Sequence, residues 1–509
     1  MANTIKGTAK ADKLAVNEND VTLTAGKGND IITVKKGRKS VIHGNGGNDT
    51  IKMTGGSYST VYGDEGAENI TVGAKVLGAT VFGGSGKDRI TVNSTKTYKS
   101  KYQDVYEGQA YTQISYIGTY VDAGNGDDTI VVNAGVGHTI YGGKGKDNIT
   151  IGKKAQAYVD GGAGNDIITV ESATQGKYVY NGETRYIGTQ INAGSGADSI
   201  TVTAGKGHMI FTGSGNDTVE IKGGKNGTVT YASGNNEFAV TGGRGYKFES
   251  EYIYDGKEYN PDNYYSKSTK WKSMVSISGG SNNSIECGNG DDTVVIKGGK
   301  NNNVSVRDGN DYVEITGGSG NSISMRTEPL EKAIGQTSVY IKGGTGTSVF
   351  SGDGKNSEIY VKGGGFKNIN SEGGTVFLSS KVKYGVDASV LSRRNGSSDN
   401  PVNYMVAWKD TINLSFEGNA DSHTDTLTLT GVRFEDLMVS TEFKDYAQIC
   451  SIVGKNGGKM TFAITKGGWD FASITVGNEI FNYKSGFVSA LERFNSGAMA
   501  GMNNNYTSK

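Results

Sequence analysis

Proline and cysteine are scarce in this chain, which has 3 prolines and 2 cysteines among 509 residues. Cys287 and Cys450 are too few for a disulfide scaffold, and we interpret both as small buried side chains. Glycine is abundant at 80 residues, but the glycines do not recur at every third position. That spacing excludes a collagen triple helix.

Net charge and long apolar segments are also absent. The 52 Lys and Arg residues equal the 52 Asp and Glu residues, so no basic field is available for nucleic acid. The N-terminal segment Met1 to Gly7 lacks the apolar core of a secretory signal, and no apolar run reaches the length of a membrane span. Taken alone, these absences predict a cytosolic protein with no nucleic-acid partner.

Motifs of the common enzyme classes are missing as well. The sequence has neither a Gly-x-Ser-x-Gly elbow nor a His-Glu-x-x-His pair, and its four histidines are scattered. Gly84-Ser85-Gly86-Lys87 imitates the end of a phosphate loop, but Asp88 stands where that loop needs Ser or Thr. We therefore predict that the chain is not an enzyme.

The sequence instead repeats one glycine-rich loop many times, and this loop ends in an acid and leads into a short strand. In the best copy, Gly161, Gly162 and Gly164 permit a tight turn, and Asp166 places a carboxylate on it. Ile168 and Val170 then give the strand one apolar face. Most copies follow one another at 19-residue intervals. The candidate metal ligands are the acids and one amide of these loops: Asp30, Asp49, Glu68, Asp88, Asp128, Asp147, Asp166, Asp198, Asp217, Asn236, Asp292 and Asp311.

These loops resemble the nonapeptide Gly-Gly-x-Gly-x-Asp-x-apolar-x of the RTX (repeats-in-toxin, haemolysin-type) proteins, over about residues 20 to 320. The resemblance implies a parallel β-roll that binds calcium between successive coils, so that each interior acid serves two neighbouring ions. It also implies export by type I secretion machinery through an uncleaved C-terminal signal. We therefore expect an extracellular or cell-surface protein, against the cytosolic reading above. Glu68 is longer than Asp, and Asn236 and Asn356 are uncharged, so these loops depart from the pattern.

The resemblance implies an all-β fold, a parallel β-roll (β-solenoid) with a β-rich C-terminal cap, and the spacing of the acids gives it 19-residue coils. Each coil has one acidic loop and one different bend, such as Gly135 to His138, which predicts one row of calcium ions along one edge. We expect an N-terminal cap at 1–20, the roll at 21–378, a linker at 379–403, and a C-terminal flanking domain with a secretion-signal tail at 404–509.

Two outward-facing columns accompany the inward Ile and Val residues. The first is a file of threonines that includes Thr71, Thr91 and Thr150, which is either ordinary strand chemistry or an ice-binding face. The second is an aromatic file that suggests a docking face. Its members are Tyr62, Phe82, Tyr141 and Phe211.

Three tyrosine-rich insertions interrupt the register at about 95–119, 174–189 and 245–274. Each has a two-residue Glu-Gly, Asn-Gly or Asp-Gly turn after a tyrosine, at Tyr106, Tyr180 and Tyr254, which are 74 residues apart. This pattern predicts three protruding β-hairpin arms. They are either tolerated loop insertions or a repeated binding element.

We expect a secreted, calcium-binding structural protein that assembles into a surface layer, fibre or matrix, as a homo-oligomer, filament or lattice. The three arm tyrosines of one copy would contact the aromatic file of another. The alternative is an adhesin that binds a host surface, a glycan or ice through the exposed sheet face and the arms.

Overall fold

The described part of the chain is nearly all β, with many strands and almost no helix, as predicted. The computed structural model describes residues 3–106, 109–180, 183–232, 234–250, 272–287, 290–307, 309–325, 336–351, 357–371, 373–385, 388–392, 401–418, 425–444, 447–464, 473–482 and 489–492. It divides into two compact units, Met1–Ser266 and Lys267–Lys509. Parallel pairing dominates in both units. Among the described residues, no helix is long and apolar enough to cross a membrane.

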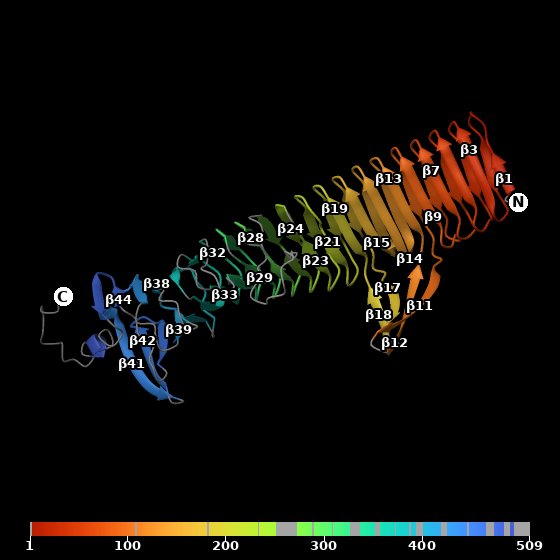
Figure 1. Cartoon of the computed structure of the whole chain (residues 1–509). Coiled ribbons are helices and arrows are strands. Elements are labelled where there is room, and N and C mark those ends of the chain that lie inside the picture. The colour runs from red at the N-terminus through yellow and green to blue at the C-terminus, as the bar shows by residue number, and fades with distance from the viewer. Residues whose placement is uncertain are drawn as a thin grey trace, which may run out of the picture. The chain divides into compact units, whose positions relative to one another are not determined.

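Unit 1 is built from two rows of parallel strands, and Figure 1 shows successive strands of a row lying next to one another. Row 1 follows the acidic loops and row 2 precedes them. Row 1 comprises β2(Lys13–Val16), β4(Ile31–Val34), β6(Thr50–Met53), β8(Asn69–Val72), β10(Arg89–Val92), the first parts of β14(Thr129–Lys144) and β15(Asn148–Ala163), β16(Ile167–Val170), β20(Ser199–Val202), β22(Thr218–Ile221) and β24(Asn236–Val240). Row 2 comprises β1(Asn3–Lys6), β3(Val21–Lys27), β5(Val41–Gly46), β7(Thr60–Glu65), β9(Thr80–Ser85), β13(Tyr120–Asn125), the later parts of β14 and β15, β19(Gln190–Ser195), β21(Met209–Phe211), β23(Thr228–Tyr231) and β25(Lys247–Ser250).

The register stacks equivalent residues of successive loops and strands. Ile51 pairs with Ile32 on one side and with Ile70 on the other. These side chains and the row 2 residues Val61 and Val81 are all 0% exposed. The predicted inward columns are therefore confirmed as the core, and they bring each acidic loop next to the following one.

The first two insertions form hairpins that join into one sheet. β11(Tyr98–Tyr106) pairs with β12(Gln109–Ile117), and β17(Gly176–Tyr180) pairs with β18(Glu183–Ile187). β12 and β17 then pair with each other, which gives a four-stranded antiparallel sheet in the order β11-β12-β17-β18. Figure 1 shows this sheet standing off one side of unit 1. We expected separate arms, but each of these two hairpins is supported by the other.

The third insertion does not occupy the same place in its coil. The first two follow the row 1 strands β10 and β16, at the bend without acids. Residues 251–271 instead follow β25, a row 2 strand, at the end where other row 2 strands lead into acidic loops. The equal spacing of the tyrosines therefore does not place the third insertion on the same edge as the first two. The expected hairpin itself lies outside the described residues.

Unit 2, taken by itself, has the same two-row arrangement of parallel strands. Row 1 comprises β26(Ser273–Ile277), β28(Thr293–Ile296), β30(Tyr312–Ile315), β32(Ser338–Ile341), β34(Glu358–Val361), β36(Gly374–Leu378), β38(Val402–Ala407), β40(Thr426–Thr430) and β44(Ser473–Val476). Row 2 comprises β27(Ser284–Glu286), β29(Asn303–Val306), β31(Ser322–Met325), β33(Thr347–Ser351), β35(Phe366–Asn370), β37(Ser389–Ser392), β39(Asn413–Gly418) and β43(Lys459–Ile464). The other elements are η2(Phe434–Asp436), β41(Leu437–Lys444), β42(Ala447–Gly454) and β45(Glu479–Asn482).

The C-terminal segment extends these rows. Tyr404 in β38 pairs with Val376 in β36 and with Leu427 in β40, all in parallel register. Among the described residues of unit 2, antiparallel pairing enters only beyond this point, where β41, β42 and β43 pair in sequence. The segment expected to be a linker contains β37, which pairs with β35 and β39 and buries Val390. This strand therefore pairs in parallel with strands on both sides of the expected linker.

Candidate metal centre

The loop acids of unit 1 form one continuous file. Except at Glu68, one carboxylate oxygen of each acid, Oδ1, accepts a hydrogen bond from the backbone N–H of the equivalent residue one coil earlier. Asp147 Oδ1 accepts from Asp128 at 2.8 Å, and Asp166 Oδ1 accepts from Asp147 at 2.8 Å. Across the first insertion, Asp128 accepts from Asp88 at 2.7 Å. The file therefore survives where the sequence interval is interrupted.

The second carboxylate oxygen of these acids is buried and has no hydrogen-bond partner among the described residues. The acids are between 0% and 2% exposed. A buried carboxylate oxygen without a partner is costly, because neither water nor a donor compensates its charge. This arrangement recurs at Asp30, Asp49, Asp88, Asp128, Asp147, Asp166, Asp198, Asp217 and, in unit 2, Asp292.

The cost is visible in the acid strength of the file. Burial raises the pKa of Asp128 to about 6 and the pKa values of Asp147 and Asp198 to about 7 each, although the hydrogen bonds to Oδ1 oppose that shift. Neighbouring carboxylates add a smaller rise, since like charges repel. Near neutral pH the file therefore needs protons or cations to neutralise it.

A small residue five positions before each acid makes room for the unpaired oxygen. A Cβ at Gly142 would lie 2.5 Å from Asp147 Oδ2 and 2.5 Å from the Gly161 carbonyl oxygen of the next coil, so a side chain there would have to displace one of these oxygens. Two hard oxygens from successive coils thus face one small space. The equivalent residues of the other acidic loops of unit 1 are Ala25, Gly44, Gly63, Gly83, Ala123, Gly161, Ala193 and Thr212.

Asn236 and Asp292 differ from the other predicted ligands in the residue that stands five positions before them. Tyr231, 4% exposed, stands five residues before Asn236, whose Oδ1 still accepts from Asp217 at 3.0 Å. In unit 2, the buried Cys287 precedes Asp292. Burial and Asp292 itself raise the pKa of that thiol. Tyrosine is much larger than the Gly, Ala or Thr found at this position in the other acidic loops of unit 1, and at Asp292 a thiol takes its place.

Asp12, which the sequence analysis missed, begins the file. Its N–H donates to Asp30 Oδ1 at 2.7 Å, whereas its own Oδ2 accepts from Thr8 N–H and Thr8 Oγ1 at 2.6 and 2.9 Å. In unit 2, Asp311 accepts from Thr337 Oγ1 at 3.1 Å through its Oδ2. In both acids, Oδ2 accepts a hydrogen bond from a threonine, whereas the Oδ2 atoms of the acids named above have no partner among the described residues. The late part of the predicted ligand set is therefore less suited to metal.

Glu68 is the irregular member. Neither of its carboxylate oxygens has a hydrogen-bond partner among the described residues, and the bond expected from Asp49 N–H is missing there. A Cβ at Gly63 would lie 2.8 Å from Glu68 Cγ, so the extra methylene occupies the space kept open elsewhere. Burial, together with the neighbouring Asp88 carboxyl, raises the pKa of Glu68 to about 9.

Shortening this side chain is expected to be stabilising. Glu68→Asp should restore the bond from Asp49 N–H and increase the free energy of unfolding in calcium by about 1 kcal/mol. Urea unfolding monitored by circular dichroism measures this change. Glu65→Asp makes the same chemical change on an exposed residue and should have no effect. A Glu68→Asp protein no more stable than wild type would show that the longer side chain is accommodated.

The donor set fits a hard cation held between coils. Each interval between coils brings two carboxylates together, and backbone carbonyl oxygens provide the other oxygens nearby. The described residues contain no cluster of three or more His, Cys, Asp or Glu side chains able to hold a metal ion. Any ion here would thus depend on backbone oxygens as well as on the acids.

The opposite bend is closed by hydrogen-bonding side chains. His138 Nδ1 accepts from Thr119 N–H at 2.9 Å, and its Nε2 lies 3.0 Å from the Ala134 carbonyl oxygen. His208 repeats this arrangement, and burial lowers the pKa of both imidazoles. Asn302 does the same in unit 2 by accepting from Asn283 N–H at 3.1 Å. These bends satisfy their backbone without an ion.

The aromatic file is a ladder of rings that contact one another. His43, Tyr62 and Phe82 stack with centroids 4.6 and 5.0 Å apart and planes within 9°. The ladder continues through two residues not predicted as members, Tyr120 and Tyr158, on either side of Tyr141. No ring contact joins Phe211 to it among the described residues. Because stacked rings turn their faces to each other, this part of the ladder offers ring edges to a partner.

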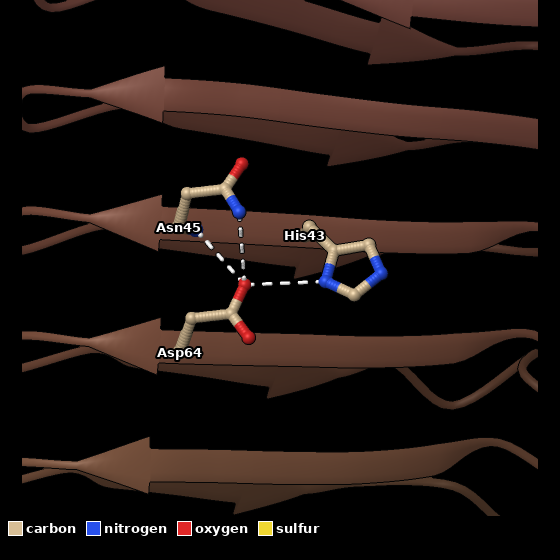
Figure 2. Close-up of polar contacts among 3 residues, drawn as sticks. All are labelled: His43, Asn45 and Asp64. Atoms are coloured by element: carbon tan, nitrogen blue, oxygen red, sulfur yellow. Dashed lines mark hydrogen bonds and ion pairs between the residues drawn. The ribbon is translucent and has the colours of Figure 1, made fainter.

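The start of the ladder carries a polar cluster, drawn in Figure 2. His43 Nδ1 lies 3.2 Å from Asp64 Oδ2, which also accepts from Asn45 N–H at 3.1 Å. Asn45 and Asp64 have φ values of 70° and 73°, where the coils from β9 to β19 have glycine. Asn and Asp tolerate this conformation better than most residues. The cluster fixes the orientation of the first ring.

The predicted arm contacts are only partly placed. Tyr106 and Tyr180 lie at the turn ends of β11 and β17, whereas Tyr254 lies outside the described residues. Unit 2 has a second ladder that sequence analysis missed, because its rings are spaced by irregular intervals. Its members are Tyr312, Tyr340, Tyr360 and Phe377.

The chain was compared with protein-family models, with curated proteins and with solved structures. No protein-family model, no curated protein and no solved structure matches this chain. The resemblance of its loops to the RTX nonapeptide thus stands on the residues themselves, and the chemistry of the acid file is the basis for any functional conclusion.

Proposed function

We propose that this protein is a secreted, calcium-binding β-roll of 19-residue coils that assembles with further copies at or outside the cell surface. It would serve as part of a surface layer, fibre or matrix. The observation that carries the proposal is the file of buried carboxylates whose Oδ2 atoms lack a partner among the described residues. A fold that repeats so costly a feature needs something to neutralise it.

Calcium is the cation that this donor set favours. Carboxylate and carbonyl oxygens are hard ligands, and calcium accepts six to eight of them in flexible geometry, at roughly 2.3–2.6 Å. Magnesium demands a stricter octahedron and keeps several waters, so it is less suited to a site built from carboxylate and backbone carbonyl oxygens. The loops of Asp30 to Asp217 would hold one row of ions, with each interior acid shared by two ions.

The extracellular location follows from the resemblance to RTX proteins, which are exported by type I secretion. Calcium is abundant outside cells, so a chain that folds on binding it would remain unfolded during export and fold on arrival. The arms support assembly, because they build a tyrosine-rich sheet that stands off the roll. Tyrosine is a favoured anchor at protein interfaces.

Electron microscopy and light scattering on the purified protein, in calcium, in magnesium and in chelator, test the proposal. We expect filaments or a lattice in calcium alone, together with several bound calcium ions per chain by elemental analysis. A protein that is fully folded in chelator at pH 8 would contradict the calcium requirement. Folded, monodisperse particles in calcium would contradict self-assembly and favour the adhesin alternative.

A further inference from the structure

The four-stranded sheet of the two insertions already contains an arm-to-arm contact. β12 of the first hairpin and β17 of the second pair in antiparallel register, with Gln113 opposite Tyr180 and Ile114 opposite Val179. The two hairpins are separated in the chain by three coils, so this contact joins elements that are distant in sequence. Strand pairing between arms is therefore a mode of association that this sequence supports.

Both outer strands of this sheet have an unpaired side among the described residues. β11 pairs only with β12, and β18 pairs only with β17. β18 is also exposed along most of its length, and Tyr186 on it is 63% exposed, the highest value among the large apolar side chains described. An unpaired edge strand is a template for another strand unless it is blocked. Neither proline nor a bulge interrupts β18.

We infer that β18 of one copy pairs with β11 of a second copy and so continues the sheet across molecules. The inference rests on the self-assembly proposed above and names its contact surface. We choose a second copy as the partner because the inner strands of the two hairpins, β12 and β17, already pair with each other. The outer strands of the same two hairpins, β11 and β18, could pair in the same way between molecules. Both hairpins share the Val-Tyr-x-Gly turn.

The direction of the strands fits such a repeat. β11, β12, β17 and β18 alternate in direction, so a fifth strand antiparallel to β18 runs in the direction of β11. A second copy would therefore join in the orientation of the first, with its own β18 unpaired. Unlike surfaces meeting in this way form a contact that propagates into a fibre or sheet of molecules and does not close into a dimer.

Two sets of proline substitutions test this contact. In a two-residue hairpin the pair that closes the turn is hydrogen-bonded, and bonded and non-bonded pairs then alternate. Thr184 and Tyr186 on β18, and Lys99 and Lys101 on β11, are then non-bonded and direct their N–H outward. Thr184→Pro with Tyr186→Pro removes the outward donors of one edge, and Lys99→Pro with Lys101→Pro removes those of the other. Proline is tolerated at such edge positions.

Analytical ultracentrifugation in calcium provides the measurement, and circular dichroism confirms that each variant is folded. Each variant alone should remain monomeric at tenfold the concentration at which wild type assembles. An equimolar mixture of the two should form dimers and nothing larger, because each pair retains only blocked edges at its ends. The matched variant Thr184→Ala with Tyr186→Ala retains both N–H groups and should still assemble.

The other outcomes are equally decisive. If wild type assembles and both proline variants assemble as well, the edge pairing is wrong although the proposed function stands. Dimers formed by the β11 variant alone would indicate pairing of β18 with β18 and would also overturn the inference. If wild type is folded but monomeric in calcium, the proposed self-assembly fails and the inference with it.

Discussion

In the absence of calcium, the protein is expected to be more stable at pH 5 than at pH 8, and calcium is expected to reverse that order. Both effects arise from the acid file. The folded chain raises the pKa of Asp128 to about 6, of Asp147 and Asp198 to about 7, and of Glu68 to about 9. In the unfolded chain, these groups return to the ordinary values near 4.

The sign follows from proton linkage. Because the folded state holds these protons more tightly, it gains stability that is fully present below about pH 4 and is lost as the pH rises from about 6 to 9. For a group shifted as far as Asp147, this amounts to roughly 4 kcal/mol. Calcium competes with the protons for the same oxygens, so the calcium-bound protein loses ions, and with them stability, as the pH falls.

Thermal melting monitored by circular dichroism at pH 5, 6, 7 and 8, in calcium and in chelator, provides the measurement. His138 and His208 act in the opposite direction, since their lowered pKa values cost stability below about pH 6.5. The comparison at each pH therefore uses the difference between calcium and chelator, which cancels this effect. Melting temperatures that vary with pH in the same direction in both solutions would contradict the assignment of the acid file as the calcium site.

Asp147→Asn and Asp147→Ala are expected to differ in sign when calcium is removed. Asparagine retains an Oδ1 that can accept from Asp128 N–H, as Asn236 does for Asp217, but it removes a buried charge. In chelator, Asp147→Asn should therefore raise the melting temperature, whereas in calcium it should lower it. Asp147→Ala should be destabilising in both solutions, because the Asp128 N–H also loses its acceptor.

The number of bound calcium ions separates the two roles of Asp147, as a hydrogen-bond acceptor for Asp128 N–H and as a calcium ligand. If each interior acid is shared, either Asp147 variant should lose about two calcium ions by calorimetry. Asp127→Asn, on an exposed acid one residue before the file, should lose none. Asp311→Asn should also have little effect, because Thr337 already satisfies the Oδ2 of Asp311. Equal losses at Asp147 and Asp311 would argue against shared ions.

The core and the position of the acids could be predicted from the sequence because both repeat with a fixed interval. The alternation of Ile32 and Ile51 with polar neighbours predicts a buried column, because this alternation is a property of each strand itself. Asp12 was not recognised, because its loop keeps only Gly7 and lacks the glycines found four and two residues before the acid in the best copy. The importance of the fifth residue before each acid was also hidden, since only the folded loop brings Gly142 against Asp147 Oδ2.

Contacts between segments distant in sequence were the least predictable part. The turns of the first two insertions were apparent from their Glu-Gly and Asn-Gly pairs, but nothing in either hairpin indicates that β12 would meet β17. The different place of the third insertion depends on which row β25 belongs to. Tyr120 and Tyr158 were missed because they occupy the column next to that of Tyr62, from which their rings still reach the ladder.

The pairing of β12 with β17 also imposes an order on how the chain acquires its structure. Neighbouring coils join residues about 19 positions apart, so growth can begin at any loop and proceed one coil at a time, at a rate that depends little on chain length. Gln113 and Tyr180 are 67 positions apart, and they meet only after the three intervening coils are stacked in register. The arm sheet is therefore complete only when the three coils between Gln113 and Tyr180 are stacked in the correct register. A molecule with a misaligned coil there would hold its two hairpins apart and could not present a finished edge.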